Sequence, residues 1–142
     1  MTDAVTTDPA TTGPATAGPA TTEVADLRAL VAVQPEATVS RTVLRADGVR
    51  IVLFAFDAGQ VLTEHTAAMP VLLQVLDGHL RVGAAGRTTD LVPSGVLHLG
   101  TRVPHTVEAV EPSRLVLTML DVRAAPVHDG TGIGPGAGRR PA

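Results

Sequence analysis

Two histidines, His65 and His105, are the residues of this chain best suited to do chemistry. His65 follows a glycine-led extended segment, and His105 lies forty positions later in the stretch RVPHTV. Imidazole titrates near neutral pH and is also a common metal ligand. Two imidazoles alone are a poor metal site, because catalytic zinc usually has three protein ligands. The pair is therefore open to three interpretations: metal binding, proton transfer, or two histidines that are merely hydrogen-bonded inside a core.

Four other side chains are candidates to complete a site around this pair. His98, in the stretch VLHLG, would be the third metal ligand if its strand turns it inward. The candidate ligand-binding residues are Gln74, Met69 and Arg102. Gln74 needs a β-bulge to face inward, Met69 suits an irregular apolar wall, and the guanidinium of Arg102 suits a substrate carboxylate.

The elements that must position these residues are short strands separated by turn signals. Asp-Gly at 47–48 and 77–78 predicts hairpins, and further turns fall at 85–86 and 93–95. Such regular spacing predicts an all-β sandwich or barrel. The nine predicted strands are 38–46, 49–56, 61–66, 71–76, 79–84, 87–92, 96–100, 105–110 and 114–120.

The pattern of apolar residues along these strands predicts what covers the sheets. In the first strand, strict alternation places Val39, Arg41, Val43 and Arg45 on one face. Three strands, IVLFAF, VLLQVL and LVLTML, are apolar on both faces, although a free-standing antiparallel sheet should alternate. Something must therefore cover the outer face. We expect an N-terminal helix to cover part of it and a second subunit, in a homodimer, to cover the rest.

The predicted helix precedes the strands. Its apolar stripe is formed by Val24, Leu27, Leu30 and Val31, with acidic residues in the first turn. Pro35 ends it, because the residue before a proline avoids the helical region.

Composition sets the remaining expectations. Residues 1–21 and 124–142 are rich in small residues, Pro and Gly and predict disordered tails around one domain at 22–123. The chain has no cysteine, no signal-peptide pattern and no apolar run long enough for a membrane span, which predicts a cytoplasmic protein. A net charge of −3 and two aromatic residues argue against a nucleic-acid partner.

The order of turns and the histidine positions resemble the cupin family of small jelly-roll barrels. The family's first motif begins with Gly, five residues and His, which Gly59 and His65 match, and Gly78 matches its closing glycine. His105 matches the histidine of the second motif. The sequence departs from both motifs. Ala67 and Val71 replace the second His and the Glu, Gly100 and Arg102 replace the Pro and Gly, and Ala109 replaces the Asn.

The resemblance implies a fold and two classes of function. In intact cupins the motif histidines and the glutamate bind a divalent metal, so Fe, Mn, Ni or Zn would be the expected cofactor at His65 and His105. Some sugar-epimerising relatives work without metal, with a histidine as base. The chain would then be an enzyme acting on a small, mostly apolar molecule inside the barrel. The alternative is a non-catalytic barrel that binds or senses such a molecule.

Overall fold

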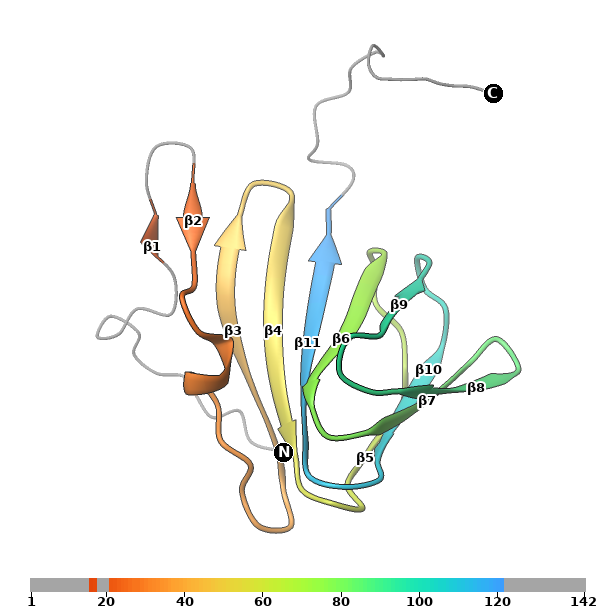
Figure 1. Ribbon diagram of the computed structural model, residues 1–142. Helices are drawn as coiled ribbons and strands as arrows, with labels where there is room; N and C mark the ends of the chain where they lie inside the picture. The colour runs from red at the N-terminus through yellow and green to blue at the C-terminus, as the bar shows by residue number, and fades with distance from the viewer. Residues whose placement is uncertain (1–15, 18–20, 122–142) are drawn as a thin grey trace.

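The computed structural model describes residues 16–17 and 21–121, which form an all-β fold of antiparallel strands (Figure 1). Two large sheets face each other, one in the order β3-β4-β11-β6-β9 and the other in the order β5-β10-β7-β8. Their strands are β3 (Thr38–Ala46), β4 (Val49–Phe56), β5 (Val61–His65), β6 (Val71–Asp77), β7 (Leu80–Ala84), β8 (Arg87–Leu91), β9 (Val96–Leu99), β10 (His105–Ala109) and β11 (Ser113–Leu120). These are the nine strands predicted from the sequence, so the all-β class is confirmed.

A small third sheet precedes the two large ones. It pairs β1 (Thr16–Ala17) with β2 (Thr22–Glu23). The rest of the predicted tails, at residues 1–15, 18–20 and 122–142, lies outside the described residues. Within the part of the chain that the structure describes, no helix is long and apolar enough to cross a membrane.

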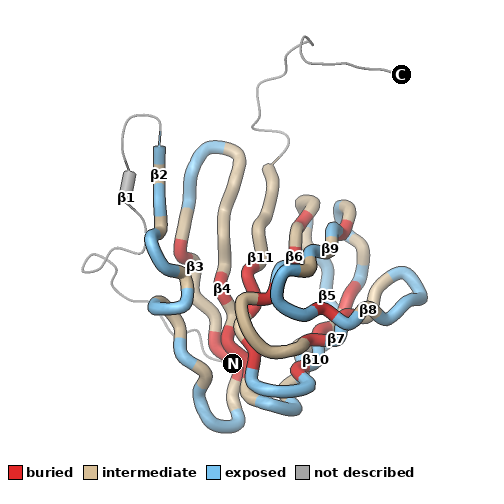
Figure 2. The backbone as a smooth tube through the Cα atoms, in the orientation of Figure 1, coloured by how far each residue is buried: buried red, intermediate tan, exposed pale blue. Residues whose placement is uncertain are grey.

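Side chains from both large sheets fill the space between them. On β6, Leu73 and Val75 are buried while Gln74 is exposed, which is the alternation expected of a strand that covers a core. Figure 2 shows buried residues gathered where the two sheets meet. Each fully buried Leu, Val or Phe contributes about 1.5–3 kcal/mol of burial free energy. The buried members are Phe56, Val71, Leu73, Val75, Leu80, Val82, Leu91, Leu99, Val107, Ala109 and Leu115.

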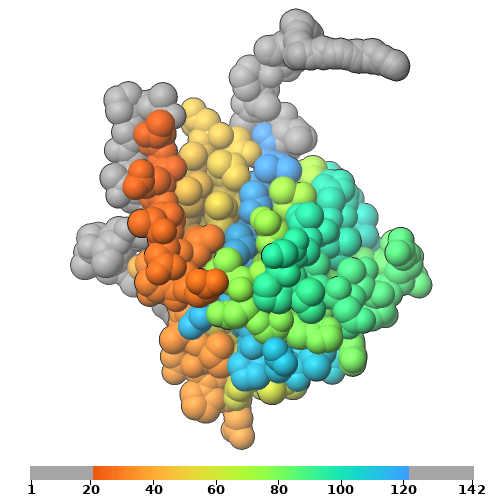
Figure 3. Space-filling model, in the orientation of Figure 1, coloured from red at the N-terminus to blue at the C-terminus, as the bar shows by residue number. Residues whose placement is uncertain are grey.

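The outer face of the five-stranded sheet is covered in part by the N-terminal segment (Figure 3). Arg114 helps to hold this segment, because its Nε donates to the Val31 carbonyl at 3.0 Å and its Nη1 donates to Asp77 at 2.7 Å. The two-sided apolar strands are therefore explained partly by the chain itself. The cluster consists of Val43, Leu53 and Val116, with Leu27, Leu30, Val31, Ile51 and Leu76 packed against them.

The predicted N-terminal α-helix is wrong. The segment contains one short 3₁₀ turn, η1 (Leu27–Ala29), whose N-cap Asp26 accepts a hydrogen bond from the Arg28 N–H at 3.0 Å. A helix of about ten residues is marginal in water, and β-branched valines weaken it further. Packing decides the outcome, because an irregular segment with one turn places Leu27, Leu30 and Val31 against the sheet.

The turn at Asp77 and Gly78 also differs from the predicted hairpin. β6 before it and β7 after it belong to different sheets, so the turn carries the chain from one layer to the other. Gly78 has a φ of +95°, and a Cβ there would collide with Ser113 Oγ and Pro112 O. The Asp-Gly pair predicts the tight turn correctly, but strand pairing depends on contacts made elsewhere in the fold.

Candidate functional site

His65 and His105 lie directly opposite each other on the paired strands β5 and β10. The register then shifts, because Val107 lies opposite Leu62, so β5 contains one extra residue in a β-bulge. The bulge lets Leu62 and His65 face the same side, on which Val107 is buried. The two ring centroids are 4.2 Å apart, with their planes inclined by 59°. The structure therefore brings the two predicted site histidines together.

Both imidazoles are held in the same way, each by the backbone carbonyl two residues before it. His65 Nδ1 lies 2.8 Å from the Thr63 carbonyl, and His105 Nδ1 lies 2.9 Å from the Val103 carbonyl. A carbonyl oxygen can only accept, so each Nδ1 carries the hydrogen and donates it. In the neutral ring the Nε2 atom then carries no hydrogen and has a lone pair that can accept one. Neither Nε2 has a hydrogen-bonding partner among the described residues.

Burial makes the two rings different. His105 is 3% exposed, whereas His65 is exposed to solvent. Burial lowers the pKa of His105 below its ordinary value, since the charged ring loses hydration. The Val103 carbonyl opposes this shift, and the charge of His65 adds to it. The lowered pKa favours the uncharged form of the His105 ring, which lies beside the solvent-exposed imidazole of His65.

The pair marks one end of the barrel. β5 ends at His65 and β10 begins at His105. The loops at 66–70 and 100–104 lead from these positions to β6 and β9 of the facing sheet, so the same ends of both sheets meet here. We call this end, formed by the two histidines and the two loops, the barrel mouth. An extended ligand could contact both rings here without entering the core.

A hollow of about 470 Å³ adjoins His105 at the barrel mouth. Glu64 and Thr106 line it, and they alternate with the inward-facing histidines, so the hollow extends over the outer side of the four-stranded sheet. The space between the sheets is occupied by core side chains. Because core side chains fill that space, a ligand that contacts the imidazoles would lie at the mouth and not deep between the sheets. The other lining residues are Gly83, Ala84, Ala85, Gly86, Arg87, Thr88 and Pro104.

The other predicted site residues are not gathered around the histidines. His98 and Gln74 are exposed on β9 and β6, where buried Leu99 and Leu73 alternate with them, so both face away from the core. Arg102 is exposed in the 100–104 loop, where its backbone N–H donates to the Ala67 carbonyl at 2.8 Å. Met69 lines a different cavity, described below.

The donor set does not fit a resident catalytic metal. Among residues 16–17 and 21–121, no three His, Cys, Asp or Glu side chains lie close enough together to hold a metal ion. His98 faces the outer side of the sheet, away from His65 and His105. The mouth therefore presents a pair of imidazoles, and such a pair can transfer protons or form hydrogen bonds.

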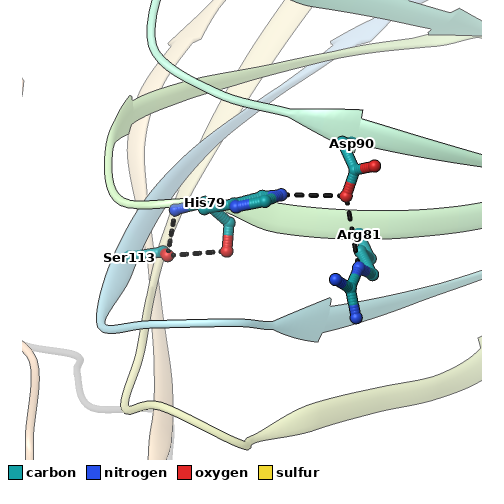
Figure 4. Close-up of polar contacts among 4 residues, drawn as sticks. All are labelled: His79, Arg81, Asp90 and Ser113. Atoms are coloured by element: carbon teal, nitrogen blue, oxygen red, sulfur yellow. Dashed lines mark hydrogen bonds and ion pairs between the residues drawn. The ribbon is translucent and has the colours of Figure 1, made fainter.

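A second cluster of titratable residues lies at the start of β7 and on β8, where His79 immediately precedes β7 (Figure 4). His79 Nε2 lies 2.9 Å from Asp90 Oδ1, and Arg81 Nε donates to the same oxygen at 3.2 Å. Ser113 Oγ instead bonds the backbone of His79, accepting from its N–H at 2.9 Å. The ring is directed away from the hydroxyl, so these residues are not a nucleophile–base pair. They form a surface ion-pair group and a turn-fixing hydroxyl.

Two arginines missed by the sequence reasoning also lie in a cavity. Arg45 lies directly opposite Arg50 in the β3–β4 hairpin. Strict alternation wrongly placed Arg45 with Arg41 and Val43, because a bulge between Thr42 and Leu44 reverses the faces. The signal was present in the sequence RADGVR, whose symmetry about the Asp-Gly turn sets the two arginines opposite each other.

Solved structures show what this architecture is similar to. A cupin superfamily protein from Desulfitobacterium hafniense is 23% identical over 66% of this chain and 86% of that chain, with a TM-score of 0.62. An RmlC-like cupin from Desulfovibrio desulfuricans is 26% identical over 64% and 89%, with a TM-score of 0.58. KdgF from a Halomonas species is 22% identical over 64% and 85%, with a TM-score of 0.57.

The likeness is carried by structure more than by sequence. No family model matches the chain, and no curated protein matches it either. The superposition nevertheless covers most of the length of each matched structure. Together with the two sheets and the positions of His65 and His105, they show that this chain has the fold of the cupin superfamily.

Proposed function

We propose that this protein binds a small, mostly apolar organic molecule at the barrel mouth and moves a proton to or from it. The observation that carries the proposal is the pair of imidazoles at 4.2 Å, each with Nδ1 held by a carbonyl and Nε2 left open. His105, kept neutral by burial, is the base. His65, exposed beside it, relays the proton to solvent.

An assay of proton exchange tests this across a panel of candidate substrates. The protein is incubated in D₂O with small enolisable ketones, and loss of the α-proton signal is followed by NMR. We expect exchange of one class to be accelerated and to fall ~100-fold or more in His105→Asn, the scale of one acid–base group. His98→Asn is the matched control, because that imidazole faces away from the mouth. Equal exchange by His105→Asn would contradict the proposal.

Metal analysis of protein purified without a histidine tag tests the competing metalloenzyme. We expect no stoichiometric iron, manganese, nickel or zinc, because two imidazoles lack the third ligand that such sites need. A stoichiometric metal that is lost in His65→Ala and His105→Ala would replace acid–base chemistry with metal chemistry at the same pair.

A non-catalytic binding barrel is the second candidate. It is favoured by the hydrogen bonds of the two rings, since both Nδ1 atoms bond backbone carbonyls and not an orienting Asp or Glu. In that case a ligand of the panel would still perturb the His65 and His105 resonances on titration. No proton exchange would accompany the binding.

We also propose that the protein is a homodimer. The outer cluster under the N-terminal segment includes no residue of the edge strand β9, where Val96 is 58% exposed. Val96 lies opposite Gln74 of β6, and the half-buried Leu72 lies two residues away on the same face of β6. A second subunit would cover this outer face. Sedimentation at micromolar concentration should show a dimer, and Val96→Lys should make it monomeric while Val61→Lys, on β5 of the other sheet, should not. A monomeric wild-type protein would remove the proposal.

A further inference from the structure

Arg45 and Arg50 form an unusual pair on the inner face of the β3–β4 hairpin. They are directly opposite residues of adjacent strands, so their side chains project from the same face. Arg50 is also paired with Met119 of β11, whose side chain packs against the core cluster, which identifies this face as the inner one. Like charges directly opposite each other across a sheet are destabilising. The fold accepts that repulsion here.

The hydrogen-bonding capacity of Arg50 is poorly used within the protein. The arginines in the ion pairs of the described residues are Arg28, Arg81 and Arg114, and neither Arg45 nor Arg50. Arg50 directs its Nε and Nη2 at the Met119 sulfur, at 3.4 and 3.1 Å. A thioether is a weak acceptor, whereas a guanidinium fork matches the two oxygens of a carboxylate. A ligand carboxylate would therefore be a better acceptor for these donors than the sulfur.

A cavity of about 210 Å³ opens at this pair. Arg45 and Arg50 are its two cationic lining residues, and Asp121 also lines it. Met69 and Met119 supply apolar surface. An anion with an apolar body fits two arginines beside two methionines, and an organic carboxylate is such an anion, whereas inorganic phosphate has no apolar body. The rest of the lining is Ala46, Gly48 and Val49.

The cavity lies at the same end of the barrel as the histidines. Met119 is paired with Val71, the first residue of β6, and the 66–70 loop connects that position to His65. Met69 belongs to this loop and lines the cavity. Arg45 and Arg50 thus stand on the five-stranded sheet at the mouth, while the imidazoles stand on the four-stranded sheet.

From this arrangement we infer that Arg45 and Arg50 form a subsite for the carboxylate of an organic acid, whose apolar body extends from Met69 and Met119 toward the imidazole pair. The inference rests on the proposed function for the direction of the ligand's body, but the anion subsite can be tested without any catalysis. The ligand class is thereby narrowed from a small apolar molecule to a small apolar monocarboxylate.

Titration of the full-length protein with hexanoate, followed by NMR, tests the subsite. We expect saturable shifts of the Arg45 and Arg50 Nε–H signals and of the Met119 methyl. We expect affinity to fall ~10-fold or more in Arg50→Gln and in Arg45→Gln, the scale of one charge-assisted hydrogen bond. Arg81→Gln is the matched control, because that arginine lies on the other sheet in an ion pair with Asp90.

Two further probes make the test decisive: an uncharged analogue of hexanoate and a different anion. Hexanamide, which has the same body without charge, should not shift the arginine signals, and inorganic phosphate should bind more weakly than hexanoate. The inference is overturned by an absence of shifts, by undiminished binding in both arginine variants, by equal binding of hexanamide, or by tighter binding of phosphate. Both variants should melt no lower than the wild type, since they relieve like-charge repulsion, so unfolding does not mimic lost binding.

The test of the carboxylate subsite can fail or succeed independently of the test of the proposed acid–base function. If hexanoate binds normally to His105→Asn and the wild type shows no proton exchange, the carboxylate subsite is supported and the acid–base role is rejected. If Arg45→Gln and Arg50→Gln still catalyse proton exchange and the protein does not bind hexanoate, the acid–base role is supported and the carboxylate subsite is rejected.

Discussion

His65 and His105 face each other across one pair of the β5–β10 ladder, with ring centroids 4.2 Å apart, and each ring therefore senses the charge of the other. A proton on one ring disfavours a proton on its neighbour. One ring is buried and the other is exposed. Burial is the larger cause that lowers the pKa of His105, and the charge of His65 lowers it further.

The first prediction concerns this coupling. In His65→Asn the pKa of His105 should rise toward its ordinary value, because the neighbouring charge that helps to lower it has been removed. The rise should be partial, since burial is the larger cause. NMR titration of the imidazole signals measures it. His98→Asn is the control, and an unchanged or lower His105 pKa in His65→Asn would contradict the coupling.

The second prediction is a dependence of stability on pH. The folded state holds the pKa of His105 below 6.5, so on acidification the unfolded state takes up the proton first. The free energy of unfolding should therefore fall as the pH drops below about 6.5, and this loss should level off beneath the folded pKa. Urea denaturation from pH 8 to 4.5 measures it, and His105→Asn should flatten the slope.

At lower pH, the stability of the protein depends on two aspartates instead of His105. Hydrogen bonds from the Glu36 and Ala58 backbone lower the pKa of Asp57, and the His79 and Arg81 side chains lower that of Asp90. Their contributions are lost only as the pH falls from 3.8 through their lowered values. A wild-type slope between pH 6.5 and 4.5 that persists unchanged in His105→Asn would assign the effect to another group.

The third prediction compares two glycines. Gly78→Ala should reduce the free energy of unfolding by ~3 kcal/mol or more, because a Cβ meets Ser113 Oγ and Pro112 O in addition to the strain of a φ of +95°. Gly48→Ala, with a φ of +82° and open space around its Cβ, should cost only ~1–2 kcal/mol. Chemical denaturation of both variants checks the difference. Equal losses would mean that strain alone, and not the layer-crossing contact, constrains Gly78.

The fourth prediction tests the N-terminal cover. Leu30→Ala should destabilise the protein by ~1–2 kcal/mol, below the 2–5 kcal/mol of a fully buried site, because Leu30 is only half-buried on the outer cluster. Ala32→Ser, at an exposed position of the same segment, should change stability by less than ~0.5 kcal/mol. If Leu30→Ala were as stable as the control, the segment would not be packed on the sheet.

NMR chemical shifts of the backbone at residues 24–31 give an independent check of the same segment. They should show no continuous α-helix, since this segment contains only the three-residue η1 turn. Helical shifts throughout these residues would favour the α-helix expected from the apolar stripe.

Turn chemistry and strand periodicity explain why much of the fold could be predicted. The nine strands, the turns at Asp47-Gly48 and Ala85-Gly86, and the all-β class follow from local backbone preferences and alternation. Ala85 and Gly86 both have positive φ, at 52° and 75°, as a tight two-residue hairpin turn demands. These features depend on residues close together in sequence, so the sequence displays them.

Features that depend on distant contacts could not be predicted in this way. The bulges in β3 and β5 invert the faces of Arg45 and His65, and no local pattern marks them because register is set by the partner strand. The N-terminal stripe of Leu27, Leu30 and Val31 fits a helix in isolation, yet the sheet it covers selects an irregular chain.

The amino-acid sequence by itself determined the strands, the tight turns and the two histidines as the residues to consider. Only the tertiary structure decided that these imidazoles adjoin, that His98 and Gln74 face away, and that Arg45 and Arg50 share a cavity. The physical reason is that side-chain direction in a sheet changes with a single-residue shift of register. That shift is settled by hydrogen bonds and packing between strands that are far apart in the chain.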